Sequence, residues 1–405
     1  MISNIQYMSG VKSLKDVDVE GKRVLIRVDF NVPVDSHNNI SDDRRIRLAL
    51  PTINYCIDHN AKSIVLVTHF GRPKGMFHEK YSLIHVRKRL ERLLEKSVDF
   101  IEDLEKAEDE ISSSSTQRVF LLENIRFYEG EKQNDKELSK KLASLCEIYV
   151  NDAFGTSHRE HASTYGITEF VSTKVAGFLM IKEIEAFSKA LQEPVRPIAL
   201  VIGGAKISSK ITLLESVLQK VDKLIIGGAM SNTFLKAQGY DMQKSLYEED
   251  FVSTAAEVLQ KAKKAGVKVY LPVDVVITDS IEKPIDVKVV PAQDILDGFM
   301  AVDIGPATLK LFSEAVELSN TIIWNGPMGI YEIDNFSKGT FKLASAIADC
   351  YAYTIVGGGD TADAVDKCGE SENFSFISTG GGASLELLEG KVLPGFKNLD
   401  RKRNN

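Results

Sequence analysis

The segment Ile198–Lys206 reads IALVIGGAK, five apolar residues followed directly by two glycines. A short apolar run that ends at glycine is typical of a strand buried on both faces of a parallel sheet. The same kind of run recurs along the whole chain, and longer segments of helical period lie between the runs. This alternation predicts an α/β protein in which helices flank parallel sheets.

The predicted elements fall into two groups. In the first half the strands are Val24–Val28, Ile64–Thr68, Val119–Leu122 and Ile148–Val150. In the second half they are Ile198–Ile202, Leu224–Ile226, Val269–Leu271, Thr321–Trp324, Thr354–Val356 and Phe374–Ile377. The predicted helices include Ile84–Lys96, Asp135–Leu145, Ser209–Lys220, Asp250–Ala265 and Lys338–Cys350. We therefore expect two Rossmann-like lobes, each a parallel sheet flanked by helices.

The length agrees with two domains, because 405 residues exceed the size of one ordinary core. The break is predicted near Lys182–Pro197, where apolar residues recur at helical spacing before two prolines that stop the segment. We expect an N-terminal lobe over residues 1–182, a connector helix over 183–197 and a C-terminal lobe over 198–390. The pattern fits a stiff connector and an ordinary packed helix equally well.

Composition excludes several classes of protein. The net charge of −7 argues against a general nucleic-acid-binding protein. The N-terminus lacks a basic flank with an apolar stretch behind it, and no apolar run approaches the roughly 20 residues that span a bilayer. The four cysteines, Cys56, Cys146, Cys350 and Cys368, are scattered without a CxxC pair, which predicts reduced, mostly buried thiols in a cytoplasmic protein.

Arginines gather after the predicted strands of the first half. Ligands of parallel α/β sheets bind beyond the carboxyl ends of the strands. The residues there are Asp29-Phe30-Asn31, His69-Phe70-Gly71-Arg72, Glu123-Asn124-Ile125-Arg126 and the loop from Asn151 to Arg159, with Arg27 in the first strand and Arg45 after it. Each arginine alone would suit a pairing with a local acid. Because converging guanidiniums repel one another without an anion, the set predicts a phosphate or carboxylate site.

The end of the last of these loops, His158-Arg159-Glu160-His161, carries two histidines. A metal site is one interpretation, but the segment offers no third ligand nearby and no thiolate. Hydrogen bonding to an anion, or simple packing within the loop, is the interpretation we favour.

Glycines follow the predicted strands of the second half. They occur in Gly203-Gly204-Ala205-Lys206, Gly227-Gly228-Ala229, Asn325-Gly326-Pro327, Gly357-Gly358-Gly359-Asp360-Thr361 and Gly380-Gly381-Gly382-Ala383. Glycine lets the backbone approach a ligand closely, and the helix that follows points its free N–H groups at a phosphate. One such turn is weak evidence because α/β proteins use glycine at many turns, but five in one domain favour a phosphate-binding lobe.

Three charged residues extend this prediction. Lys206 and Lys210, four apart at the opening of a predicted helix, are expected on one face near the phosphates. Asp360, at a predicted helix start, is the candidate ligand of Mg²⁺, and capping the helix is its alternative role. No GxxxxGK[ST], GxGxxG or GxSxG motif occurs at a position that would support a Walker cradle, a dinucleotide dehydrogenase or a serine hydrolase.

The loops taken together resemble those of the phosphoglycerate kinases. The similar motifs, in the order that the family has them, are Arg27 to Pro33, Arg45-Ile46 ahead of Leu50 to Ile53, His69 to Pro73, Glu123 to Phe127, Asn151 to Gly155, Gly203 to Lys206, Trp324 to Pro327, Gly358 to Thr361 and Ser378 to Gly382. The resemblance covers nearly the whole chain. Its departures are Phe70, where leucine is usual, and a short extra tail over about Met1–Ser9. Neither departure touches a chemical group.

The resemblance implies a role for each group of residues. The phosphoglycerate would be held by Arg27, Asp29, Asn31, Arg45, His69, Phe70, Gly71, Arg72, Arg126 and Arg159. The nucleotide would be held by Lys210, Gly228, Asn325, Glu332, Gly358, Gly359, Asp360 and Thr361, with Glu332 at the ribose and Mg²⁺ on Asp360. Residues 391–405 are expected to return to the first lobe. The family further suggests a cytoplasmic monomer of glycolysis that uses ADP and ATP, without nucleic acid or membrane partners.

The expected reaction is the reversible transfer of the acyl phosphate of 1,3-bisphosphoglycerate to Mg-ADP. Both reacting oxygens are already ionised at neutral pH, so catalysis reduces to in-line positioning and neutralisation of the moving phosphoryl group. We expect Arg45, Lys206 and Gly381 to act on that group, after the lobes have closed and expelled water. A different sugar-acid or acetate-type kinase, and a binding protein that has lost catalysis, are the alternatives.

Overall fold

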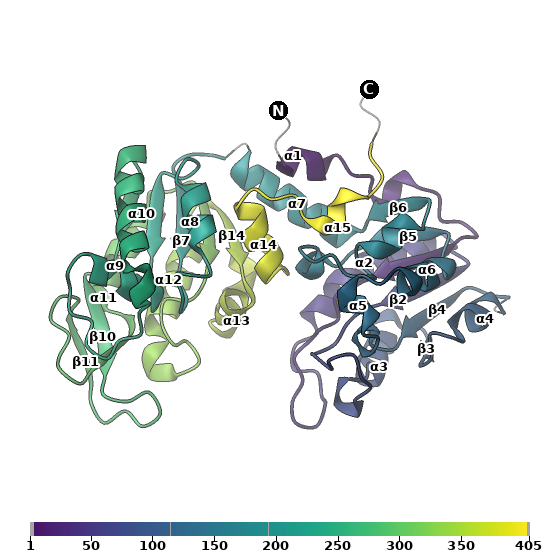
Figure 1. Cartoon of the computed structure of the whole chain (residues 1–405), viewed down its shortest axis with the longest axis horizontal. Coiled ribbons are helices and arrows are strands. Elements are labelled where there is room, and N and C mark those ends of the chain that lie inside the picture. Colours follow the sequence, from purple (N-terminus) through teal and green to yellow (C-terminus); the bar gives the residue numbers. More distant parts are fainter. Residues whose placement is uncertain (1–3, 114, 193, 403–405) are drawn as a thin grey trace. The chain divides into compact units, whose positions relative to one another are not determined.

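The computed structural model describes residues 4–113, 115–192 and 194–402. The chain divides into two compact units, Met1–Glu185 with Lys391–Asn405, and Ala186–Gly390 (Figure 1). Each unit contains a six-stranded sheet with helices around it. The predicted fold class is therefore confirmed.

The first unit is built on a parallel sheet with the strand order β3-β4-β2-β1-β5-β6. Its strands are β1 (Arg23–Arg27), β2 (Ser63–Val67), β3 (Val98–Ile101), β4 (Arg118–Leu122), β5 (Ile148–Asn151) and β6 (Thr173–Ala176). Its helices are α1 (Asn4–Ser9), α2 (Arg44–Asp58), α3 (Ile84–Leu94), α4 (Ala107–Ser112), α5 (Gly130–Gln133), α6 (Lys136–Ser144) and α15 (Pro394–Lys397). Apolar residues of α2 and α3 pack with those of β1 and β2 in one core, which explains why the central strands are almost continuously apolar.

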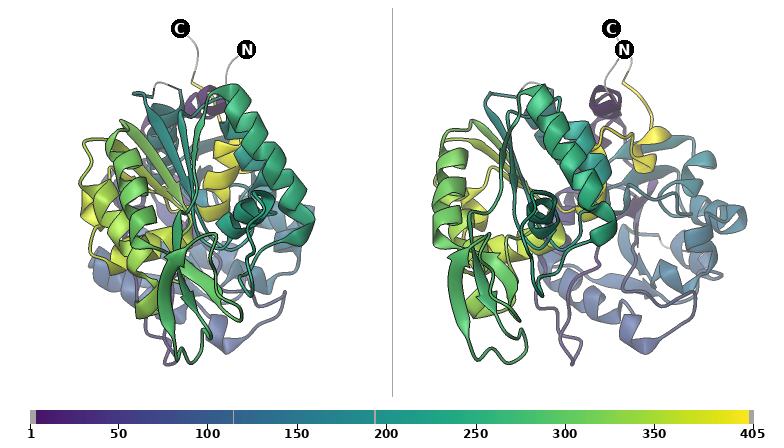
Figure 2. Two further views of the ribbon diagram at one scale, coloured as in Figure 1. Left: turned by 90° about the vertical axis from the view of Figure 1, so that its left-hand side faces the viewer. Right: turned by 60° about the vertical axis from the view of Figure 1, so that its left-hand side comes forward.

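The second unit is built on another parallel sheet, with the order β15-β14-β13-β7-β8-β9. Its strands are β7 (Ile198–Ile202), β8 (Lys223–Ile226), β9 (Lys268–Tyr270), β13 (Thr321–Asn325), β14 (Tyr353–Gly357) and β15 (Phe376–Ile377). Its helices are α8 (Ile211–Val217), α9 (Met230–Ala237), α10 (Val252–Ala265), α11 (Pro306–Glu317), α12 (Lys338–Ala348), α13 (Gly359–Lys367) and α14 (Gly381–Leu388). Figure 2 shows helices on both sides of this sheet, and Trp324 is fully buried in the core that α11 and α12 share.

A small antiparallel sheet lies in the second unit and was not predicted. Its order is β11-β10-β12, with β10 at Asp274–Thr278, β11 at Val287–Pro291 and β12 at Met300–Ile304 (green in Figure 2). The strands escaped prediction because they lack long apolar runs: β11 is largely exposed and contains Lys288. The strands β3 and β6, which are only half buried, were missed for the same reason.

Helix α7 (Phe178–Leu191) runs through the boundary of the two units. It begins four residues ahead of the predicted break at Lys182. Its first turn is capped from outside, because Asp152 Oδ1 accepts from the backbone N–H groups of Leu179 (2.8 Å) and Met180 (3.3 Å). That residues 183–197 act as a connector stays a prediction.

Both ends of the described chain pack on the first unit. Val11 and Arg401 form an antiparallel bridge, Lys12 N donates to Asp400 O (2.7 Å), and Lys402 N donates to Gly10 O (3.0 Å). Farther in, Gly395 N donates to Ser157 O (2.8 Å) and Asn151 Nδ2 to Gly395 O (3.1 Å). Across residues 4–402, with 114 and 193 set aside, none of the helices has the length and apolar character needed to cross a membrane.

Candidate active site

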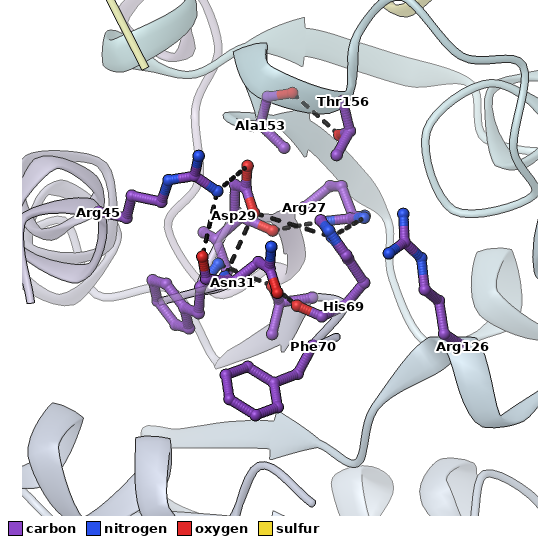
Figure 3. Close-up of polar contacts among 12 residues, drawn as sticks. Arg27, Asp29, Asn31, Arg45, His69, Phe70, Arg126, Ala153 and Thr156 are labelled. Carbon is purple, nitrogen blue, oxygen red and sulfur yellow. Dashed lines mark hydrogen bonds and ion pairs between the residues drawn. The ribbon is translucent and has the colours of Figure 1, made fainter. Parts of the chain in front are cut away.

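The carboxyl ends of β1, β2, β4 and β5 carry a cluster of charged side chains in the first unit (Figure 3). Parallel pairing in register puts Arg27 beside Val67 and Asn151, so the loops after these strands begin at the same edge. Arg45 and Arg126 reach the cluster from opposite sides, and Asp29 and His69 lie between them. The arginine convergence predicted from the loops is thus present for Arg27, Arg45 and Arg126.

Arg27 is fully buried at the centre of the cluster. Its Nε donates to Ser163 Oγ (2.8 Å), and Nη1 donates to Val28 O. Its Nη2 lies 3.3 Å from His69 Nδ1, and because a guanidinium only donates, this ring nitrogen accepts. Burial, and the charges of Arg27, Arg126 and Arg159, lower the pKa of His69 well below its ordinary value, although Asp29 opposes them. The ring is therefore neutral at pH 7.

Asp29 is the carboxylate that orients Arg45. Its Oδ2 accepts from Arg45 Nη1 (3.1 Å), which also donates to Asn31 O (3.2 Å). Burial alone would raise the pKa of Asp29, but Arg45, His69 and Arg27 together hold it below its ordinary value. Asn31 in turn accepts through Oδ1 from Gly71 N (2.8 Å), so the loops after β1 and β2 are tied together.

Arg126 and Arg159 add positive charge to the same cluster. Arg126 is buried, with Nη1 donating to Gly71 O (2.7 Å) and Nε left without a partner among the described residues. Burial, together with Arg159 and Arg27, lowers the pKa of Arg126 to about 10. Arg159 is half buried and donates through Nε to His158 Nε2 (3.1 Å). Buried guanidiniums that repel one another, one with an unused donor, have the chemistry of an anion site.

The remaining predicted residues of this unit lie around the cluster. Phe70 is buried, and its backbone N–H donates to Asn124 Oδ1 (3.0 Å). Arg72 is exposed, and none of the hydrogen bonds and ion pairs among the described residues involves its side chain. A hydrated arginine at the rim suits an anion that arrives from solvent, but Arg72 is not part of the buried cluster.

The two histidines of the loop after β5 pack against different partners. His161 Nδ1 lies 3.6 Å from Glu131 Oε1, and His158 accepts from Arg159. The described residues contain no group of three or more potential metal-ligating side chains. The side chain of His161 thus has a structural partner in the buried carboxylate of Glu131.

In the second unit, backbone glycines meet where β7, β8 and β13 end. Gly204 N donates to Pro327 O (2.9 Å), and Gly228 N donates to Met328 O (3.1 Å). A Cβ added to Gly228 would lie 2.5 Å from Gly204 N, so only glycine permits these loops to approach. The loops form a surface made of backbone, which a planar or polyphosphate ligand can approach closely.

Two helices point their N-termini at this region. Gly358 caps α13, and a Cβ on Gly381, the first residue of α14, would lie 3.6 Å from Gly359 N. Asn325 Nδ2 donates to Gly357 O (2.8 Å), and Thr361 Oγ1 accepts from Gly326 N (2.7 Å). The free N–H groups and dipoles of the neighbouring helix starts favour an anion at this place.

The two lysines lie in different environments, so the prediction that they share one helix face is wrong. Helix α8 begins only at Ile211, with Lys210 as its N-cap. Lys210 Nζ is turned inward and donates to Gly203 O (2.6 Å) and Asn325 O (3.2 Å), whereas Lys206 is exposed in the loop. Burial lowers the pKa of Lys210 to about 8, against the opposing charge of Asp360.

Asp360 lies in the first turn of α13 and is exposed; Gly358, not Asp360, is the cap. None of the hydrogen bonds and ion pairs within the described residues engages its carboxylate. An exposed, unengaged carboxylate fits Mg²⁺, which binds through one or two carboxylates and the phosphates of its substrate. The residues present therefore fit the metal that the sequence predicts.

A cavity of about 320 Å³ lies beside the glycine loops. Gly204 and Gly228 line one part of it, Glu332 and Asp360 another, and the antiparallel sheet supplies Val275, Met300 and Val302. Its size is that of a small-molecule pocket, apolar with a few polar groups. The wall from β10 and β12 was missed by sequence reasoning, although the β-branched residues of Asp274–Thr278 were a signal for a strand.

Comparisons with known proteins bear on the whole chain. The family model described as phosphoglycerate kinase matches residues 14–391. Phosphoglycerate kinases of Wolinella succinogenes and Helicobacter hepaticus are each 62% identical, over 402 and 400 residues; the matches cover 99% of this chain in both cases, and 100% and 99% of the relatives.

Solved structures give the same result. The phosphoglycerate kinase of Coxiella burnetii superposes with a TM-score of 0.85 at 42% identity, over 96% of this chain and 98% of that one. That of Pyrococcus horikoshii gives 0.84 at 32% identity, with the same coverage.

Proposed function

The chain belongs to the phosphoglycerate kinase family, and on that premise we propose that its two units divide the substrates between them. The family's reaction is the reversible transfer of the acyl phosphate of 1,3-bisphosphoglycerate to Mg-ADP, which gives 3-phosphoglycerate and ATP in glycolysis. The chain is thus a kinase whose phosphate acceptor in the reverse direction is a carboxyl group, and the resemblance seen in its sequence is confirmed. The division into lobes over 1–182 with 391–405, and 198–390, is part of the proposal.

The first unit would hold the phosphoglycerate. In this assignment Arg27, Arg126, Arg159 and Arg72 receive its anionic groups, while Asp29, Asn31 and His69 orient the arginines and the hydroxyl. Phe70 and Gly71 would supply backbone at the edge of the site. The observation that carries the assignment is the buried guanidinium cluster, in which Arg126 Nε has no partner within the part of the chain that the structure describes. A bound phosphate or carboxylate would satisfy that donor.

The second unit would hold the nucleotide. Gly228 and Glu332 line the 320 Å³ cavity suited to the nucleoside. Asn325, Gly358, Gly359 and Thr361 would form the backbone cradle for the phosphates, with Lys210 beside them. Asp360 would hold Mg²⁺, which when bound neutralises phosphate oxygens and fixes their geometry.

The chain's own residues then perform an in-line transfer without a general base. Arg45 would leave its contact with Asp29 to meet the moving phosphoryl group from one side. Lys206 and the N–H of Gly381 would meet it from the other, so that charge is neutralised as it spreads over the equatorial oxygens. Exclusion of water by lobe closure completes the proposed sequence.

The experiment is ATP formation from ADP dependent on 1,3-bisphosphoglycerate. Arg45→Ala and Lys206→Ala are each expected to lower kcat by roughly 10²–10³-fold, the usual cost of removing one transition-state donor. Arg47→Ala on the same helix as Arg45, and Lys263→Ala on α10, remove exposed charges and serve as matched controls. Near wild-type kcat in either test variant would overturn its catalytic role.

We further propose that the enzyme works in the cytoplasm as a monomer. All four cysteines are free, with Cys56 and Cys146 buried and Cys350 and Cys368 partly buried. Free thiols suit a reducing compartment. Sedimentation of the purified protein together with fractionation of cells would test the proposal, and a stable dimer or an association with membranes would contradict it.

A further inference from the structure

Glu131 is among the buried charged residues that have no part in the proposed mechanism. Glu131, in the four-residue helix α5, is fully buried on the first unit. Burial alone would raise its pKa, but His161, Arg27 and Ser163 together hold the pKa below its ordinary value, so the group is a carboxylate. An ionised carboxylate in the interior is costly unless charged partners and hydrogen bonds compensate it.

The partners of Glu131 lead to the phosphoglycerate cluster. Its Oε2 accepts from Ser163 N (2.9 Å), and its Oε1 accepts from Ser163 Oγ (2.7 Å). Since the serine hydrogen is used toward Glu131, the lone pairs of Ser163 Oγ are free to accept from Arg27 Nε at 2.8 Å. Arg27 Nη2 then donates to His69 Nδ1 (3.3 Å). A continuous hydrogen-bonded chain thus runs from Glu131 through Ser163 and Arg27 to His69, which lies beside Asp29 in the cluster.

The backbone of Glu131 holds the same loop. Its carbonyl oxygen accepts from Ala162 N (2.9 Å), next to Ser163 and three residues after Arg159. Tyr149 OH donates to Ser163 O (2.9 Å) from β5. Arg126 lies five residues ahead of Glu131 in the same connection, after β4. One residue therefore joins the three segments that bring Arg27, Arg126 and Arg159 together.

We propose that Glu131 is a positioning residue for phosphoglycerate binding, which acts by fixing Ser163 so that Arg27 and the loop of Arg159 face the substrate. The inference rests on the proposed phosphoglycerate site. Electrostatics distinguishes a positioning role of Glu131 from a role in which its negative charge only compensates the nearby arginines. Removal of a negative charge from beneath an anion site strengthens its attraction for an anion, whereas loss of positioning weakens binding. The two roles predict opposite signs.

The test uses the full-length protein with Glu131→Gln, which keeps the volume of the side chain but cannot accept both bonds from Ser163. The KM for 3-phosphoglycerate is expected to rise about tenfold and the KM for ATP to change less than about twofold, since a hydrogen bond to a charged group is worth about one decade. Ser163→Ala keeps the carboxylate and removes the link to Arg27, with an expected rise of about threefold. In the double variant the effects are expected not to add, because both break the same chain.

Glu123→Gln is the matched control for loss of a buried carboxylate. Glu123 is also buried in the first unit and also accepts from a serine hydroxyl, Ser82 Oγ (2.6 Å), and from backbone N–H groups, but it holds the start of α3. This variant is expected to lower Tm and to leave the KM for 3-phosphoglycerate within about twofold of wild type.

An unchanged or lower KM for 3-phosphoglycerate in Glu131→Gln would overturn the proposal, and full additivity in the double variant would overturn the shared chain. If Glu131→Gln does not fold, Ser163→Ala decides alone, and an unchanged KM in that variant counts against the proposal. Calorimetric binding of 3-phosphoglycerate to Arg126→Ala separates this outcome from failure of the site itself. Wild-type affinity in Arg126→Ala would contradict the proposed phosphoglycerate site. Lost affinity in Arg126→Ala together with wild-type affinity in Glu131→Gln would contradict only the role of Glu131.

Discussion

At the scale of single residues, Lys210 is hydrogen-bonded within the protein and also belongs to the proposed nucleotide-binding residues. Its ammonium donates to two carbonyl oxygens in a half-buried position, and desolvation lowers its pKa to about 8. Carbonyl dipoles compensate only part of the desolvation. Near pH 8, therefore, only a fraction of Lys210 is protonated until a bound anion stabilises the charged form.

Nucleotide binding is thus expected to take up protons near pH 8. The phosphates raise the pKa of Lys210 from about 8, so the fraction that is neutral in the free protein becomes protonated on binding. Calorimetry of ADP binding in buffers of different ionisation enthalpy measures the uptake, which is expected to reach roughly half a proton. Lys210→Met is expected to bind more weakly and to show no uptake. The same uptake in that variant would assign the proton to another group.

Asp29 leads to a second prediction, which concerns how stability depends on pH. Its folded pKa lies below the ordinary value of 3.8, so its ionised form stabilises the fold above that pH. The contribution is lost as the pH falls through the folded pKa. The Tm of the wild type is expected to exceed that of Asp29→Asn above about pH 4, and the difference is expected to shrink in more acidic buffer. A difference that is constant with pH would mean that the ionisation of Asp29 does not contribute.

At the scale of elements, the proposed phosphate cradle depends on two helix starts and one glycine. Gly358 caps α13 with φ +99° and ψ 137°, a conformation open essentially only to glycine. A Cβ at this position would lie 3.1 Å from Asn325 Nδ2 and 3.4 Å from Thr361 Oγ1. An added methyl group would therefore strain the backbone and press on two of the proposed nucleotide contacts.

Gly358→Ala is expected to weaken ADP binding by at least about tenfold and to leave 3-phosphoglycerate binding unchanged. Gly369→Ala is the control, since Gly369 follows α13 at its other end with φ +79°, and a Cβ added there would meet only open space. Both variants are expected to lose about 1–3 kcal/mol of stability. Calorimetric titration of each ligand separates the two effects, and equal ADP affinity in both variants would argue against the cradle.

Burial determined which elements were predictable from the sequence. Strands such as β7, buried on both faces, are uninterrupted apolar runs and were found, whereas β11 and β3 are partly exposed and carry charged residues. Asp29, His69 and Arg126 could be placed at one edge of the sheet from the sequence because they follow strands. Glu131 could not, because its relation to Arg27 spans more than one hundred residues and depends on packing of the loop after β5.

At the scale of the whole molecule, the proposed substrate residues belong to two compact units. Direct transfer requires the reacting atoms to approach within about 3–3.5 Å. If the ligands bind as proposed, the units bring them together, and closure is expected to need both ligands.

Small-angle scattering is expected to show a smaller radius of gyration with 3-phosphoglycerate and Mg-ADP together than with either ligand alone, since in the proposed arrangement each ligand binds only one unit. Asp360→Asn is expected to reduce the compaction if Mg²⁺ is held there. Identical radii in the free and doubly liganded protein would argue against closure.

Two segments far apart in the sequence meet on the first unit, through the pairing of Val11 with Arg401 and of Lys12 with Asp400. The segment that carries Gly395 also fixes the loop after β5. During translation, the first unit leaves the ribosome long before these residues are made. The segment from Lys391 onward, which packs on the first unit, is missing until the second unit has been synthesised. Of the two units, the one that is translated first is therefore completed last. A ribosome that stops short of Lys391 releases a second unit with all its strands but a first unit that lacks the segment from Lys391 onward.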